Sequence, residues 1–151
     1  PLEATCVNDV LTDELERARL LAGGKSIESR LSATHRLHVD APEKVLAVLL
    51  GNLLRNAFSY TDAGEVTVDV DAASVVIRDT GVGIAPGQID AMYQPFVRGD
   101  AGRRGGHGVG LTIVRRLSDR FGWPVTIDSS PGVGTRVEIR FPQARSEPLG
   151  A

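Results

Sequence analysis

Apolar and polar residues follow two different periods along this chain, and the changes of period outline its secondary structure. From residue 7 to residue 21 apolar side chains recur at helical spacing, which predicts a helix that Gly23 and Gly24 end. From residue 65 to residue 71 valines alternate with polar residues, which predicts a strand that forms a hairpin with residues 74–78. The same patterns predict helices at 42–60, 88–93 and 110–122, and strands at 26–31, at 125–128, at 135–141 and in a segment that ends at Val39.

These elements predict an α+β fold, namely a two-layer α/β sandwich in which a mixed sheet of about five strands carries three main helices on one face. With 151 residues the chain fits a single domain over 1–151, without internal repeats. We expect residues 142–151 to form a frayed tail. Because the sequence begins at Pro1 without an initiator methionine, we expect it to be a fragment of a larger protein.

The composition narrows the classes of function. The chain has 17 Lys and Arg against 19 Asp and Glu, so it has no broad basic surface for nucleic acid. Cys6 is the one cysteine, which excludes an internal disulfide and fits a reducing compartment. No apolar run approaches the roughly 20 residues of a membrane span, and no signal peptide is visible.

Two asparagines stand out in the predicted helix at 42–60. Asn52 and Asn56 are four residues apart and therefore lie on one face, together with Ser59. An unsatisfied buried carboxamide costs about 1–3 kcal/mol, so the pair needs partners. Nearby backbone groups could supply them, or the neutral oxygens could serve a hard cation such as Mg²⁺. The opposite face is apolar and predicts a core of Leu46, Leu50, Leu53, Leu54 and Ala57.

An acidic residue followed by alternating glycines marks the end of the predicted strand at 74–78. Asp79 leads into Gly81 and Gly83, where the backbone can turn tightly or lie against a ligand.

Two further glycine-rich motifs follow. Residues 105–110 precede the helix at 110–122, and free N–H groups at a helix N-terminus suit a phosphate. Gly132 and Gly134 precede the strand at 135–141. One such motif is ordinary turn chemistry, but a succession of them at strand and helix ends is not.

These motifs together closely resemble the ATP-binding domain of sensor histidine kinases. That family belongs to the GHKL superfamily (Bergerat fold), which also holds gyrase, the ninety-kilodalton heat-shock chaperones and the mismatch-repair ATPases. The resemblance runs from about residue 2 to residue 141. The motifs occur in the family's order: the N box at 52–60, the first glycine box at 79–83, the F box at 95–98, the second glycine box at 106–110 and the last at 132–135.

The resemblance implies a domain that binds ATP and Mg²⁺. It places Asp79 at the exocyclic amine of adenine, where guanine would present a second acceptor and be rejected. Tyr60 is expected beside the base or ribose, with plain core packing as the alternative. Asn56 is the expected metal ligand and Asn52 its supporting polar partner. The full set expected at the nucleotide is Asn52, Asn56, Tyr60, Asp79, Gly81, Gly83, Arg98, Gly106, His107, Gly108, Val109, Gly110, Leu111 and Thr135.

The resemblance also assigns the phosphate contacts. Arg98 and the backbone N–H groups of residues 108–110 are expected to hold the phosphates, under a lid formed by residues 99–106. Many relatives have Lys at the position of Ser59, so one phosphate contact is either missing or supplied by Arg55.

The function implied is that of a protein histidine kinase domain. It would donate the γ-phosphoryl group of ATP to a histidine that lies outside this chain, so no catalytic residue is assigned here. Because Asn52 stands where hydrolytic relatives have a general-base glutamate, we expect little ATP hydrolysis. The implied partners are ATP, the dimerisation and phospho-acceptor helices of the same kinase, and a response-regulator receiver domain. The domain would be cytoplasmic, in a membrane-anchored homodimer of the bacterial inner membrane.

Two other functions stay open. A serine kinase that acts on an anti-sigma regulator would share the motifs, although it usually has Glu at or near position 52. A degenerate nucleotide-sensing module that works by docking would not need Asp79 and Asn56 intact. Residues 24–26 imitate the end of a P-loop but lack its earlier glycine, and His35 and His38, at strand spacing, fit one face of a sheet better than a metal site.

Overall fold

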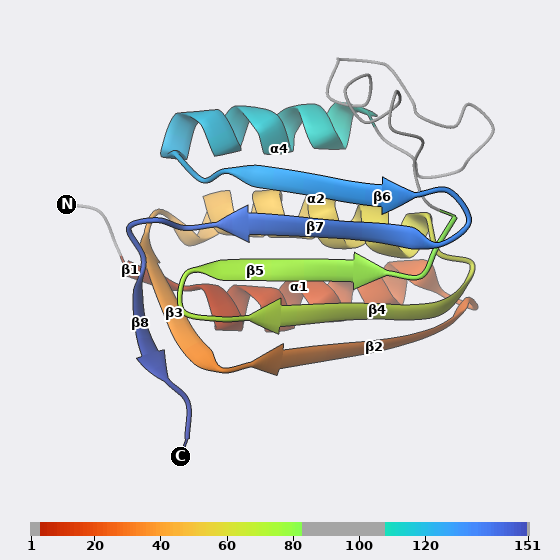
Figure 1. Ribbon diagram of the computed structural model, residues 1–151, viewed down its shortest axis with the longest axis horizontal. Helices are drawn as coiled ribbons and strands as arrows, with labels where there is room; N and C mark the ends of the chain where they lie inside the picture. Colours follow the sequence, from red (N-terminus) through yellow and green to blue (C-terminus); the bar gives the residue numbers. More distant parts are fainter. Residues whose placement is uncertain (1–3, 83–107, 151) are drawn as a thin grey trace.

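The computed structural model describes residues 4–82 and 108–150. They form three helices and two sheets (Figure 1). In chain order the elements are β1 (Ala4–Cys6), α1 (Val7–Ala22), β2 (Ser26–Ala33), β3 (His35–Asp40), α2 (Glu43–Ser59), β4 (Ala63–Val70), β5 (Ser74–Asp79), α4 (Gly108–Phe121), β6 (Val125–Ser130), β7 (Gly134–Arg140) and β8 (Arg145–Pro148).

The larger sheet has five strands in the order β2-β4-β5-β7-β6. β2 runs parallel to β4, and the other neighbours are antiparallel. A parallel pair needs a crossover connection, and here the crossover consists of β3 and α2. The predicted mixed sheet of about five strands and the predicted hairpin between β4 and β5 are therefore confirmed.

The helices cover one face of this sheet, which gives the predicted α+β sandwich (Figure 1). α2 contacts α1 on one side, α4 on the other, and β5 beneath it. The predicted apolar face of α2 is buried: Leu46, Leu50, Leu53, Leu54 and Ala57 are each at most 5% exposed. Gly23 ends α1 as predicted, with a φ of 62° that an L-residue rarely adopts.

A second, small sheet was not predicted. β3 leaves the main sheet and pairs with β1 on one side and β8 on the other, antiparallel to both. The expected frayed tail is wrong for residues 145–148, because they form β8. Arg145 fixes the pairing through two hydrogen bonds to the carboxylate of Asp40, at 3.0 and 3.2 Å. The predicted helix at 88–93 lies outside the described residues.

Candidate nucleotide-binding site

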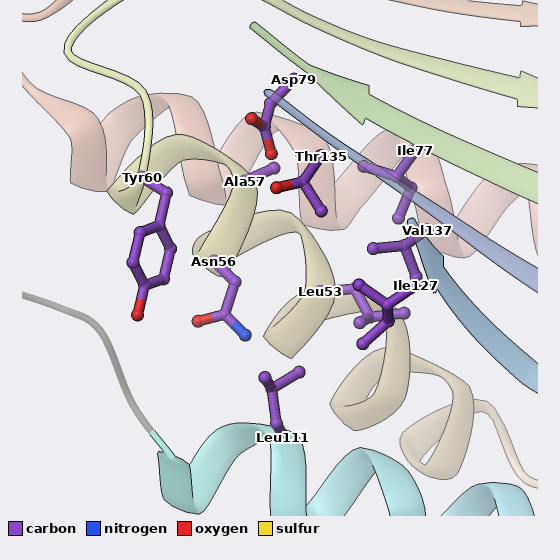
Figure 2. Close-up of a pocket in the computed structure, with 10 residues that line it drawn as sticks. All are labelled: Leu53, Asn56, Ala57, Tyr60, Ile77, Asp79, Leu111, Ile127, Thr135 and Val137. Carbon is purple, nitrogen blue, oxygen red and sulfur yellow. The ribbon is translucent and has the colours of Figure 1, made fainter. Parts of the chain in front are cut away.

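A cavity opens between the C-terminal half of α2, the strands β5, β7 and β6, and the start of α4 (Figure 2). Five residues that the sequence assigned to the nucleotide site line this one cavity: Asn56, Tyr60, Asp79, Leu111 and Thr135. They come from four elements and from the residue that follows α2, so the fold brings together side chains that are up to 79 positions apart, from Asn56 to Thr135.

The polar end of the cavity is built by the last residue of β5. Asp79 lies opposite Thr135 in the β5–β7 ladder, and Figure 2 shows the carboxylate beside the hydroxyl group. One carboxylate oxygen, Oδ1, accepts a hydrogen bond from the backbone N–H of Gly81 at 2.9 Å. The hydroxyl of Thr135 is in turn 2.7 Å from the hydroxyl of Ser129 on β6. These contacts hold an acidic group at the wall of the cavity in a defined orientation.

The rest of the wall is apolar. Ile77, Val137 and Ile127 form one cross-strand row over β5, β7 and β6. They meet α2 and α4 across the cavity, as Figure 2 shows. The sequence assigned none of these three to the site. Ile127 and Val137 alternate with polar neighbours and Ile77 ends an apolar run, which are patterns of strands that face a core. The apolar lining residues that went unassigned are Leu53, Ala57, Ile77, Ile127 and Val137.

The two asparagines of the N box differ in environment. The amide nitrogen of Asn56 is buried and has no hydrogen-bond partner among the described residues, and this side chain lines the cavity. Asn52 instead donates from Nδ2 to the carbonyl of Val48 at 2.7 Å and accepts from Arg55 at 3.2 Å. Of the two alternatives that the sequence left open, Asn52 therefore takes the first, a partner in the nearby backbone. It is not among the described residues that line the cavity.

Glycines allow three segments to meet beside the cavity. A Cβ on Gly81 would collide with the carbonyl oxygen of Tyr60, and one on Gly134 would collide with the carbonyl oxygen of Asp79. At the same place the N–H of Val82 donates to the Tyr60 carbonyl at 2.9 Å. The first and last glycine boxes are thus close-packing sites that tie the end of α2 to β5 and to the β6–β7 turn.

Only the last three residues of the second glycine box, 108–110, are among the described residues. Residues 108–110 form the first turn of α4, where backbone N–H groups lack partners within the helix. The helix begins two residues earlier than predicted. Gly83, Arg98, Gly106 and His107, like the lid at 99–106, lie outside the described residues.

Both histidines lie on β3, but the expectation that they share one face of a sheet is wrong, because side chains three residues apart in a strand point to opposite faces. His35 Nδ1 lies 2.9 Å from the hydroxyl of Thr34, and His38 Nε2 lies 3.7 Å from a carboxylate oxygen of Glu147 on β8. Over residues 4–82 and 108–150, no group of three or more His, Cys, Asp or Glu side chains is arranged to hold a metal ion.

Residues 41–145 match the family described as histidine kinase-, DNA gyrase B- and HSP90-like ATPases, and the chain belongs to this family. It is 28% identical over 145 residues to the sensor-like histidine kinase SenX3 of Mycobacterium tuberculosis H37Rv, covering 90% of this chain. The chain spans only 35% of the length of that relative. It is therefore an ATP-binding domain of the kind found in two-component sensor histidine kinases.

Solved structures agree with this assignment. The mycobacterial sensor histidine kinase MprB superposes with a TM-score of 0.79 at 25% identity, over 99% of this chain and all of that one. Full-length ShkA in complex with AMPPNP gives a TM-score of 0.79 at 26% identity, over 98% of this chain and 32% of that one. Among the described residues, no helix is both long enough and apolar enough to cross a membrane.

Proposed function

We propose that this domain binds Mg-ATP and donates its γ-phosphoryl group to a histidine on a separate dimerisation domain, as the kinase half of a two-component sensor. The observation that carries the proposal is the cavity itself. It joins an oriented carboxylate, Asp79, to an apolar slot between sheet and helices, beside an asparagine whose amide nitrogen is buried. A flat base with an exocyclic amine fits such a slot. The phosphates of the nucleotide would then lie near the N-terminal turn of α4.

Recognition of adenine rests on Asp79. One carboxylate oxygen is engaged by the N–H of Gly81 at 2.9 Å, and the carboxylate still has acceptor capacity for the adenine amine. Guanine presents a carbonyl oxygen at the same position, so two acceptors would face each other in a half-buried site. Because unpaired buried acceptors are costly, the site favours ATP over GTP. Tyr60 and the apolar row of Ile77 and Val137 would flank the base or ribose.

Asn56 is the group suited to the metal. The amide nitrogen of Asn56 is buried without a hydrogen-bond partner among the described residues, and a phosphate oxygen of a bound nucleotide would satisfy this donor. The carboxamide oxygen of the same side chain is a ligand that Mg²⁺ accepts. When bound, Mg²⁺ would neutralise phosphate charge. The first turn of α4 would offer its free N–H groups to the phosphates, with Arg98 as a further contact.

The residue at position 52 separates transfer from hydrolysis. An asparagine cannot take a proton from water, and here its amide is already hydrogen-bonded to Val48 and Arg55. The domain would therefore hold ATP for transfer rather than hydrolyse it. Arg55 is engaged with Asn52, which argues against Arg55 as the substitute for the missing lysine at Ser59.

The remaining parts of the proposal concern the rest of the protein. The partners would be the phospho-acceptor helices of the same kinase and a response-regulator receiver domain, in a homodimer anchored to the bacterial inner membrane. SenX3, of which this chain spans about a third, is named a sensor-like histidine kinase, which supports the kinase part of this proposal.

Mixing the chain with a separate acceptor-helix domain and ATP labelled at the γ-phosphate tests the proposal. Acid-labile phosphate on the acceptor, with slow release of free phosphate, is the expected result. Acid-stable phosphate on serine would favour the serine kinase instead. Nucleotide binding without any transfer, to acceptor domains from several kinases, would favour a docking module. Turnover of ATP at about 1 s⁻¹ or faster would place the chain among the hydrolytic relatives.

A further inference from the structure

Lys25, which the sequence offered only as an imitation of a P-loop lysine, caps the C-terminal end of α2. Its Nζ donates hydrogen bonds to the carbonyl oxygens of Phe58, Thr61 and Ser59, at 2.9, 3.0 and 3.2 Å. The carboxylate of Asp62 lies 3.8 Å away. The side chain is 31% exposed, so the ammonium is largely enclosed by the chain that leaves the helix.

The contact gives hydrogen-bond partners to carbonyl groups at the C-terminal end of α2. The last carbonyl groups of a helix have no partner within it, and they carry the negative end of the helix dipole. The last turn of α2 contains no basic residue. The N–H of Tyr60 caps the carbonyl of Asn56, and a single cation from the connection between α1 and β2 adds the compensating charge and the donors for the carbonyls that follow.

The same turn supplies the nucleotide site. Tyr60 follows α2 directly and lines the cavity, one turn after Asn56. Its carbonyl oxygen accepts the N–H of Val82 at 2.9 Å, on the side of the first glycine box. The carbonyls of Phe58, Ser59 and Thr61 turn to Lys25 instead. The end of α2 is thus held from two sides, by the glycine box and by Lys25.

We propose that Lys25 is a positioning residue for the nucleotide: its ammonium group fixes the end of α2, and so keeps Tyr60 and Asn56 in the geometry that binds ATP. This inference rests on the proposed function of the cavity. Lys25 does not line the cavity, and its effect passes through the backbone of residues 58–61.

The test compares Lys25→Met with Lys44→Met in the whole chain. Lys44 is the other lysine of the chain, and it is exposed near the opposite end of the same helix. Methionine keeps the length and apolar stem of lysine but removes the charge and the donors. Affinity for Mg-AMPPNP is measured by calorimetry, and backbone amide exchange is followed at Tyr60, Thr61 and Val82.

Lys25→Met is expected to weaken nucleotide binding about tenfold, which is the scale set by one hydrogen bond to a charged group. Exchange at the three amides should accelerate, whereas Lys44→Met should match the wild type in both measurements. Lys25→Arg, which keeps the charge, should recover most of the affinity. Should Lys25→Met fail to fold, Lys25→Gln takes its place; glutamine keeps a donor but loses the charge and is too short to reach all three carbonyls, so binding should still weaken severalfold.

A variant whose folded fraction binds within twofold of the wild type overturns the inference, even if its unfolding midpoint falls. So does acceleration of exchange throughout the domain rather than at the end of α2. If the wild type itself binds no nucleotide, the proposed function fails, and the inference fails with it. Binding by the wild type together with unchanged binding by the variant leaves the proposed function standing and removes only the role of Lys25.

Discussion

The carbonyl oxygen of Tyr60 lies in the space that a side chain at position 81 would need. The backbone of the first glycine box therefore packs directly on the end of α2, and the N–H of Val82 completes the contact with its hydrogen bond to the same oxygen. This contact between Gly81 and Tyr60 joins the strand that carries Asp79 to the helix that carries Asn56.

Replacing Gly81 by alanine should break this contact. The added Cβ meets backbone of Tyr60 and the buried hydroxyl of Thr61, neither of which can move aside cheaply. We expect the free energy of unfolding to fall by about 1–3 kcal/mol, the usual cost of overpacking. Chemical denaturation measures it, with Gly24→Ala as the matched control because a Cβ there meets nothing within 4 Å. Equal stability of the two variants would contradict the close contact.

Asp79→Asn should weaken ATP binding at least about tenfold while the fold stays intact. The asparagine oxygen can still accept the N–H of Gly81, but the NH₂ group then faces the amine of adenine, donor against donor. Calorimetry with AMPPNP measures the loss, and Asp128→Asn, at an exposed position of β6, provides the control. Unchanged affinity in the Asp79 variant would show that adenine does not bind at this end of the cavity.

Asn56→Ala should reduce the dependence of nucleotide binding on Mg²⁺ more than it reduces binding itself. Among the described residues, the substitution removes the one carboxamide that lines the cavity, and the apolar slot and Asp79 remain. Titrations of nucleotide with and without Mg²⁺ give, for the wild type and for the variant, the factor by which Mg²⁺ strengthens binding. If Mg²⁺ strengthens binding by the same factor in both proteins, Asn56 is not the metal ligand.

The turn between β4 and β5 should contribute to the pH dependence of stability. Partial burial raises the pKa of Asp71, but hydrogen bonds from Ala73 N–H and from the hydroxyl and N–H of Ser74 outweigh it, so that the pKa lies below its usual value of 3.8. Because the folded state has the lower pKa, the contribution is present above pH 3.8 and is lost as the pH falls through the folded-state value. Unfolding measured from neutral to acidic pH should show a shallower decline for Asp71→Asn than for the wild type. If the free energy of unfolding falls equally with pH in both proteins, the acid sensitivity comes from groups other than Asp71.

The sequence predicted the parts of this domain that depend on local patterns. The helices followed from apolar spacing, and the hairpin of β4 and β5 followed from alternation and a turn between them. Asp79 and Asn56 were assigned to the site because the motifs that contain them, an acid before alternating glycines and a pair of asparagines on one helix face, resemble those of the family. The structure places both at one cavity; what they bind there remains a prediction.

What the sequence missed depends on contacts between distant segments. β8 consists of four exposed residues without alternation, and its ladder to β3 spans more than a hundred positions. Lys25 reaches carbonyls 33 to 36 residues away, and a backbone acceptor leaves no trace in a sequence. The sequence likewise gave no reason to expect that β3 would leave the main sheet, since an extended segment has the same pattern in either sheet.

The small sheet determines how the domain would respond to tension. β1 pairs with the end of β3 near Asp40, and β8 pairs with the end near His35, both antiparallel to β3. A force that pulls the two ends of the described chain apart would therefore act along the strands, in shear, and would load both ladders at once. Figure 1 places this sheet at the far end of the domain from the β5 terminus that carries Asp79. Mechanical strain arriving through either end would be borne by β3 before it reached the cavity.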